Sequence, residues 1–215
     1  MSVKIMDNKI NDLAVIDRVL AGDIAFYEII IRRYNPLVYK VGRSYGMQHE
    51  DVQDAMQDTF ISAYEKLSQF QRKSQLSTWL IRIMINKCLY KMNMQEKNVP
   101  LSTNGDSSAL QQQFTPVEPG KFPLQTELKK ILELSLEKLP EQYRLVFLLR
   151  ETENFSVAET AEALNITPLN VKVRLHRAKA MMREYLEQWY TRSDIYEFNL
   201  KYCSAVVENV LARIA

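Results

Sequence analysis

Residues 156–183, SVAETAEALNITPLNVKVRLHRAKAMMR, contain the clearest signals of local structure in this sequence. Ser156 and the glutamate three residues after it form a capping box, which predicts the start of a short helix. Asn165 suits a left-handed turn, because asparagine tolerates a positive φ better than most residues. Thr167-Pro168 then supplies an N-cap and a proline at the first position of a second helix. Two helices joined in this way predict a helix-turn-helix.

The second helix of this motif has a buried ridge and a basic face. The ridge consists of Val171, Leu175, Ala178 and Met182, which recur at helical spacing. Five cations and no acid lie between residues 165 and 183, which is typical of either a solvated cationic helix or a recognition helix. The preceding turn favours DNA reading in the major groove. The side chains expected to contact duplex DNA are Thr167, Asn170, Lys172, Val173, Arg174, His176, Arg177 and Lys179.

Upstream, residues 51–68 predict a helix with one buried and one acidic face. The buried face contains Val52, Met56, Thr59, Phe60, Ala63 and Leu67. The opposite face contains Asp51, Asp54, Asp58 and Glu65, with Ile61 beside them. Such a stripe is either a solvated helix face or a docking surface for a basic partner. The apolar Ile61 within the stripe favours docking.

The charge inverts in the next helix, which the sequence predicts over 78–94 with Ser77 as its N-cap. Residues 70–94 contain five cations and no acid. A broad apolar arc consists of Leu80, Ile81, Met84, Ile85, Cys88, Leu89 and Met92, and the opposite stripe carries Trp79, Arg82, Asn86, Tyr90 and Asn93. Rings can stack on unpaired bases while cations hold phosphates, so the stripe predicts a single-stranded nucleic-acid surface. Alternatively, Trp79 and Tyr90 pack against a neighbouring helix.

The chain as a whole is expected to be all-α, with two helical domains joined by a flexible linker. Of its 215 residues 47% are hydrophobic and 25% charged, which is typical of a globular protein. The expected limits are 12–94 for the first domain, 95–123 for the linker, 124–190 for the helix-turn-helix domain and 191–215 for a helical extension. Four of the seven prolines lie in the linker. Pro36 is expected to restart a helix, and Gly42 to loosen the chain.

Several function classes are not expected from this sequence. It contains no run of about 18 apolar residues and no secretory signal pattern, so we expect a cytoplasmic protein. Cys88 and Cys203 form no CxxC pair, and His49 and His176 are the only histidines. Neither a Gly-rich phosphate loop nor a paired metal motif occurs. We therefore expect no enzyme activity, no cofactor and no metal.

Three segments of the sequence resemble regions of one known protein family. The segment 51–94, which contains DVQDAMQDTFISAYEKLSQF and STWLIRIMINKCLYKM, resembles region two of extracytoplasmic-function (ECF) sigma factors, the specificity subunits of bacterial RNA polymerase. Residues 136–184 are similar to region four of that family, and GDIAFYEIIIRRY at 22–34 extends the likeness. Its most specific features are D-x-x-Q-D-x-F at 54–60 and V-K-V-R-L-H-R-A at 171–178.

The resemblance implies a role for each surface. The acidic stripe would dock on the basic clamp coiled coil of the largest polymerase subunit; the residues concerned are Asp51, Asp54, Gln57, Asp58, Ile61 and Glu65. A loop at 69–75 would capture a base of the minus-ten element, and the stripe of the next helix would line the melted strand; these residues are Gln69, Phe70, Gln71, Arg72, Lys73, Trp79, Arg82, Asn86 and Tyr90. The helix at 168–179 would read the minus-thirty-five element. A Ser or Thr is frequent in the family where Val173 stands, so a thymine methyl contact would replace a hydroxyl contact.

The resemblance also implies partners: core RNA polymerase, promoter DNA and an anti-sigma factor, with no small-molecule substrate and a monomer outside the holoenzyme. Two alternatives stay open. A stand-alone dimeric helix-turn-helix regulator explains residues 156–183 but not the upstream helices. A sigma-like decoy that binds an anti-sigma factor does not need the cations of the last helix. The 191–215 extension, with its apolar face, is expected either to pack onto region four or to dock a regulator.

Overall fold

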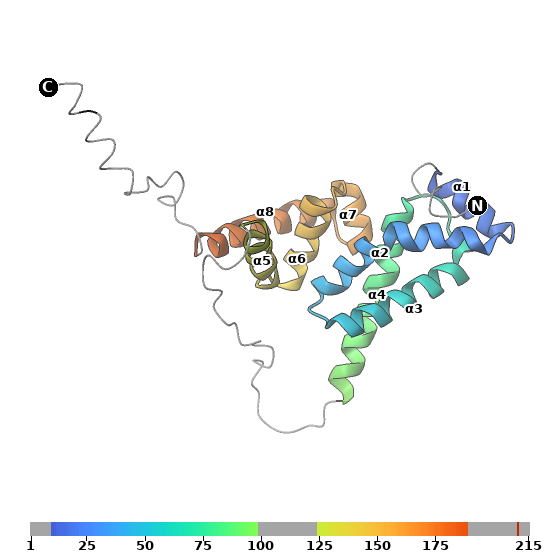
Figure 1. Cartoon of the computed structure of the whole chain (residues 1–215), viewed down its shortest axis with the longest axis horizontal. Helices are drawn as coiled ribbons and strands as arrows, with labels where there is room; N and C mark the ends of the chain where they lie inside the picture. Colours follow the sequence, from blue (N-terminus) through green and yellow to red (C-terminus); the bar gives the residue numbers. More distant parts are fainter. Residues whose placement is uncertain (1–9, 99–123, 189–209, 211–215) are drawn as a thin grey trace.

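A computed structural model describes residues 10–98, 124–188 and Val210 of the chain, and all regular elements in these ranges are helical. The first group comprises α1 (Asp12–Leu20), η2 (Ile24–Phe26), α2 (Tyr27–Ser44), α3 (His49–Glu65), η3 (Leu67–Gln69) and α4 (Leu76–Asn98). The second comprises α5 (Leu124–Glu137), α6 (Glu141–Phe147), the π-helical η4 (Leu148–Thr152), α7 (Val157–Leu164) and α8 (Pro168–Glu187). We refer to α1–α4 as the N-terminal bundle and to α5–α8 as the C-terminal bundle (Figure 1).

The N-terminal bundle is built by α2, α3 and α4, which pack on one another, with α1 against α2. Each helix has apolar residues at helical spacing, and these side chains turn toward a common core; Val38, Val52 and Leu80 are fully buried there. The buried face predicted for the 51–68 helix is confirmed by the burial of Val52, Thr59, Phe60, Ala63 and Leu67, and Met56 is half-buried against the same core. Cys88 is also in the core, as predicted.

Some sequence-based expectations about this bundle were wrong. Pro36 does not restart a helix, because α2 runs through it, and its packing on α3 and α4 offsets the hydrogen bond lost at the proline. Ser77 does not cap α4, since the helix already begins at Leu76 and the amide of Trp79 donates to the Gln75 carbonyl. Leu89, expected in the apolar arc, is exposed. The helix also continues past residue 94, into the expected linker.

Gly42 lies inside α2 and does not loosen the chain; it allows a close crossing of helices. A Cβ atom at this position would lie 2.6 Å from Met84 Cε and 2.7 Å from Val52 Cγ1. The methyl end of Met84 can move away, but the branched Val52 side chain is stiff at χ1. The approach of α2 to α3 therefore depends on the missing side chain.

The C-terminal bundle holds two small cores around α8. One contains Leu139, Ala178 and Met182, and the other contains Val146, Ala161 and Val171. The ridge that the sequence predicted for the last helix thus supplies Ala178 and Met182 to the first core and Val171 to the second. Its partners are Leu139, which lies between α5 and α6, Val146 of α6 and Ala161 of α7.

The largest apolar core extends through both bundles. Leu145 of α6, Leu148 and Leu149 of η4, and Phe155 belong to the same cluster of buried residues as the α2 and α4 side chains. In space, α7 lies between α8 and the N-terminal bundle and contacts α4 (Figure 1). The described parts of the two bundles therefore form one packed unit.

We predict that Gly42→Ala lowers the free energy of unfolding by about 1–3 kcal/mol, because the new methyl group overpacks the crossing and outweighs the gain in helix propensity. Urea unfolding followed by circular dichroism measures the change. In a Val52→Ala background, which opens space at the same point, the cost of Gly42→Ala should be smaller. An unchanged or raised stability of the single variant would contradict this account of the crossing.

Candidate nucleic-acid interface

The helix-turn-helix forms as the sequence predicted. The structure shows the hydrogen bond or the backbone conformation that corresponds to each local signal. The amide of Glu159 donates to Ser156 Oγ at 3.1 Å, and the amide of Ser156 donates to Glu159 Oε2 at 2.7 Å, which completes the capping box. Asn165 has φ 51° and ψ 47°, the left-handed conformation. Thr167 Oγ1 then accepts from the amide of Asn170 at 3.2 Å and caps α8. These bonds fix the direction in which α8 leaves the turn.

The outer face of α8 carries most of the side chains that the sequence assigned to DNA. Lys172, His176 and Arg177 are exposed, and Arg174 is half-buried. Two of the cations have partners within the chain: Lys179 Nζ lies 2.9 Å from Glu151 Oε1, and Arg177 Nη1 lies 3.4 Å from Tyr143 Oη. Both contacts lie on an exposed surface, where such interactions are weak enough to exchange for a DNA phosphate.

Leu169 is a candidate contact that the sequence reasoning missed. Its side chain is 69% exposed in the first turn of α8, one turn before the exposed Val173. An apolar residue at this point can contact the methyl group of thymine in a major groove. The signal was present in the sequence, because Leu169 does not belong to the ridge that begins at Val171.

The second candidate surface lies on α4 and the 69–75 loop. Tyr90 is 63% exposed, and Arg82 and Asn86 are exposed as well, so much of the predicted stripe is on the surface. Phe70 is only 7% exposed and packs against Trp79, with the ring centroids 5.2 Å apart. This contact matches the alternative interpretation of Trp79 as a packing residue, and it places Phe70 in the core in this structure.

The loop itself turns sharply at Arg72, whose φ of 57° is unusual for a residue with a side chain. The Arg72 guanidinium pairs with Asp17 of α1, which ties the loop to the start of the bundle. Gln71 and Lys73 on either side are exposed. The loop therefore presents polar and cationic groups on a fixed backbone.

The third candidate surface is the acidic face of α3. Asp54, Gln57, Asp58 and Glu65 are exposed, and Asp51 is half-buried. Ile61 is 58% exposed among them. Lys91 Nζ of α4 lies 3.3 Å from Asp54 Oδ2, at one edge of the stripe. Ile61 and most of the acids that the docking hypothesis requires are thus accessible on one face of α3.

Comparison with known families identifies the family of the chain that carries these three surfaces. The family model Sigma-70 region 2 matches residues 30–97, and the model Sigma-70, region 4 matches residues 129–182. The two matches occur in this order and together cover more than half of the chain. The chain belongs to the sigma-70 family. Its α3 and α4 lie in region 2, and its helix-turn-helix lies in region 4, as the resemblance implied.

Relatives of this sigma factor match over nearly their full length. The ECF RNA polymerase sigma-E factor of Haemophilus influenzae is 27% identical over 187 residues, which cover 85% of this chain and 98% of the relative. That of Escherichia coli is 29% identical over 181 residues, which cover 81% of this chain and 93% of the relative. These matches place the chain in the ECF type.

Two solved structures have a similar fold. One is CnrH in complex with the cytosolic domain of CnrY, with a TM-score of 0.59, 23% identity and coverage of 82% of this chain and 97% of that chain. The other is the sigma factor RpoE in complex with the anti-sigma factor NepR from Bartonella quintana, with a TM-score of 0.58, 23% identity and coverage of 75% and 96%. The all-helical architecture is thus shared with both.

Further observations concern the chemistry that the described residues of the sigma factor can support. Burial raises the pKa of the Cys88 thiol to about 12, so the thiol stays protonated and is a poor nucleophile or metal ligand. Residues 10–98 and 124–188 hold no group of three or more potential metal ligands. Within the same ranges, no helix combines the length and the apolar character that a membrane crossing requires. The 191–215 extension lies outside the described residues except for Val210, which is helical.

We predict that Ser156→Ala lowers the free energy of unfolding by about 1 kcal/mol at neutral pH, because the first turn of α7 loses its cap. Hydrogen bonding with the Ser156 hydroxyl and amide lowers the pKa of the Glu159 carboxyl from its ordinary value of 4.5. A carboxyl whose pKa is lowered by folding stabilises the fold above its unfolded pKa, and this contribution disappears as the pH falls through the folded pKa. The stability difference between wild type and variant should therefore shrink on acidification below about pH 4.5.

The measurement is urea unfolding of wild type, Ser156→Ala and Ser156→Thr across this pH range. The threonine variant retains the hydroxyl and should behave like wild type. A difference between wild type and the alanine variant that does not change with pH would show that the capping box does not depend on the ionised glutamate.

Proposed function

We propose that this sigma factor binds core RNA polymerase through α3, holds the melted minus-ten strand on α4 and the 69–75 loop, and reads the duplex minus-thirty-five element with α8. The observation that carries the proposal is the presence of three different exposed surfaces on one chain. These are an acidic and apolar stripe, an aromatic and basic stripe, and the basic face of a helix-turn-helix. A stand-alone regulator needs only the third surface, and a decoy does not need its cations.

Each surface has a chemical character that suits its proposed partner. The acids of α3, with Ile61 among them, complement a basic coiled coil of the polymerase. Tyr90 offers an exposed ring for stacking, and Arg82 offers a cation for phosphates. Phe70 anchors the loop by packing on Trp79 of α4. Lys172 and Arg177 in the first turns of α8 are positioned like the reading residues of other helix-turn-helix proteins.

We further infer the setting in which these surfaces act. The N-terminal bundle, from about residue 12 to 94, would work as the polymerase-binding and melting domain. The bundle from about 124 to 190 would work as the duplex-reading domain, with 95–123 as the linker between them. The chain would act in the cytoplasm by binding, without catalysis. An anti-sigma factor is proposed as a second protein partner, since RpoE from Bartonella quintana was solved with the anti-sigma factor NepR.

The docking surface gives the first test. Asp58→Lys reverses a charge in the middle of the acidic stripe and should weaken co-elution with purified core polymerase about tenfold or more, because a like charge would face the basic partner. Asp23→Lys, at an exposed acid of the same bundle outside α3, is the matched control and should bind like wild type. Failure of the wild-type chain to co-elute with core polymerase would end the proposal.

The recognition helix gives the second test. Lys172→Ala or Arg177→Ala should cost about 1–3 kcal/mol in holoenzyme binding if the side chain contacts a base. Loss of a phosphate contact should instead reduce the slope of log affinity against log salt by about one unit. The substrate is the genomic fragment that wild-type holoenzyme transcribes best in run-off assays. Arg183→Ala, farther along α8, is the control, and wild-type transcription by both test variants would show that α8 is not the reading helix.

A further inference from the structure

The outward face of α8 carries two exposed apolar side chains one turn apart, Leu169 and Val173. Leu169 is 69% exposed and Val173 is 40% exposed. Neither belongs to an apolar cluster formed by the described residues, so packing within this part of the chain does not account for them. At about 100° per residue they lie within about 40° of each other, on the side of α8 opposite the buried Val171. We refer to Leu169 and Val173 as the apolar pair.

The start of α8 holds the apolar pair on a fixed backbone. Leu169 is the second residue of the helix, which begins at Pro168. The bond from the Asn170 amide to Thr167 Oγ1 caps this turn, so the backbone that carries Leu169 is kept helical although it lies at the helix end. The first turns of a recognition helix are the part that meets base edges in the major groove. The pair therefore occupies the reading position of the helix.

Two exposed cations flank the apolar pair. Around the helix, Lys172 lies about 60° to one side of Leu169, and Arg177 lies about 40° beyond Val173 on the other side. Cations on both sides can hold phosphates at the edges of a major groove and direct the pair toward the base edges between them. Among the four DNA bases, thymine alone presents a methyl group there. Apolar side chains in this place therefore suit thymine.

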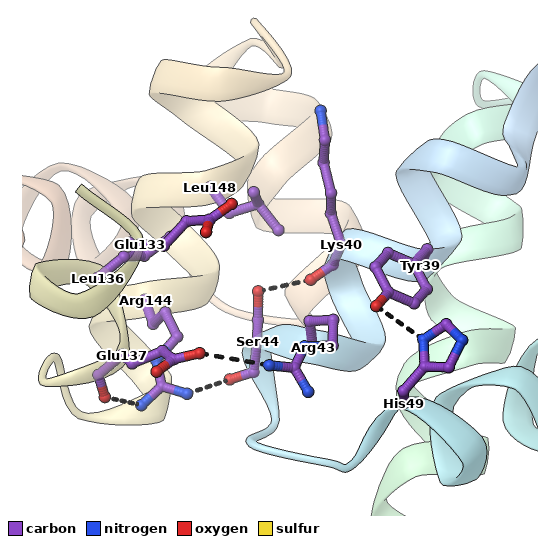
Figure 2. Close-up of a pocket in the computed structure, with 10 residues that line it drawn as sticks. All are labelled: Tyr39, Lys40, Arg43, Ser44, His49, Glu133, Leu136, Glu137, Arg144 and Leu148. Atoms are coloured by element: carbon purple, nitrogen blue, oxygen red, sulfur yellow. Dashed lines mark hydrogen bonds and ion pairs between the residues drawn. The ribbon is translucent and has the colours of Figure 1, made fainter. Parts of the chain in front are cut away.

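The contacts that join the two bundles lie away from the apolar pair. Lys40 Nζ of α2 lies 2.6 Å from Glu153 Oε1. Arg144 Nη1 donates to the carbonyl of Ser44 at 3.1 Å, across the boundary (Figure 2). The cavity of about 420 Å³ at this boundary is lined by residues of α2, α3, α5, α6 and η4. The pair is thus accessible in the arrangement that the structure shows.

We infer that the apolar pair determines specificity by reading thymine methyl groups in the duplex minus-thirty-five element. The inference deepens the proposed function and rests on it, because it assumes that α8 enters the major groove. Residues four apart in a helix are separated by about 6 Å along its axis. Successive base pairs are about 3.4 Å apart. The two side chains therefore read two thymines that lie within about two base pairs of each other.

The test removes the methyl groups alone. Deoxyuridine pairs with adenine as thymidine does and lacks only the methyl group that thymine presents in the major groove. The DNA is the genomic fragment that wild-type holoenzyme transcribes best, with each thymidine of its minus-thirty-five region replaced in turn by deoxyuridine. At two positions, the replacement should weaken binding of wild-type holoenzyme about three- to fivefold, as expected for one buried methyl group. Competition binding against the unmodified fragment measures the ratio.

Protein variants assign each methyl group to a side chain. Leu169→Ala should abolish the preference for thymidine at one position and keep it at the other, and Val173→Ala should do the reverse. Leu169→Met retains an apolar side chain of similar length and should keep both preferences. Leu20→Ala is the matched control and should also keep both, because Leu20 is a 48% exposed leucine on α1 of the other bundle.

The ratio of affinities for the thymidine and deoxyuridine fragments is the decisive quantity, because impaired folding or polymerase binding of a variant affects both fragments equally. The ratio should be the same at low and high salt, since a methyl contact releases no counterions. Equal affinity of wild-type holoenzyme for every fragment would overturn the inference. A thymidine preference that persists unchanged in both Leu169→Ala and Val173→Ala would overturn it as well.

Failure of the proposed function has a different signature. In that case the wild-type chain neither co-elutes with core polymerase nor directs run-off transcription, and the inference falls with it. A holoenzyme that transcribes its promoter, but binds thymidine and deoxyuridine fragments equally well, is still a sigma factor. Its α8 would then read DNA without the apolar pair.

Discussion

Leu148, Leu149 and Phe155 are buried in the same core as side chains of α2 and α4, and this shared burial determines how the two bundles pack together. Because apolar side chains from both bundles share one core, the two cannot separate without exposing it to water. The position of α7 over α4 follows from this shared burial, since η4 and α7 are joined by only a few residues. The ion pairs at the boundary select the register of the contact, whereas the shared core supplies its strength.

The helix-turn-helix was predicted correctly down to its caps because its signals are local. A serine followed by a glutamate three residues later needs no distant partner to form a capping box, and Asn165 adopts its left-handed conformation within one turn. The restart expected at Pro36 was wrong for the opposite reason. The packing of α2 on two neighbouring helices overrides the local preference of one residue, and this packing has no mark in the nearby sequence.

For the candidate surfaces, the sequence predicted which side chains share a helix face but not which of them have partners elsewhere in the chain. Helical spacing was enough to find the acidic face of α3 and the stripe of α4, because it determines which side chains share a face. It could not show that Phe70 turns inward or that Glu162 lies beside Arg82. Those facts depend on partners brought together from distant parts of the chain, and the Lys40–Glu153 pair joins residues more than 100 positions apart.

Arg144 constrains the orientation of one bundle relative to the other at their boundary. Its planar guanidinium donates to the carbonyls of Ser44, Glu137 and Leu139, so one rigid group serves backbone atoms from both bundles. A fork of fixed donors tolerates little rotation, unlike the rotatable ammonium of a lysine. Sliding one bundle along the other would break the bond to Ser44, whereas the bonds to Glu137 and Leu139 lie within the C-terminal bundle and keep the guanidinium in place. The C-terminal bundle therefore presents a pre-oriented donor to the end of α2, and the two bonds inside that bundle fix the direction from which the Ser44 carbonyl must approach.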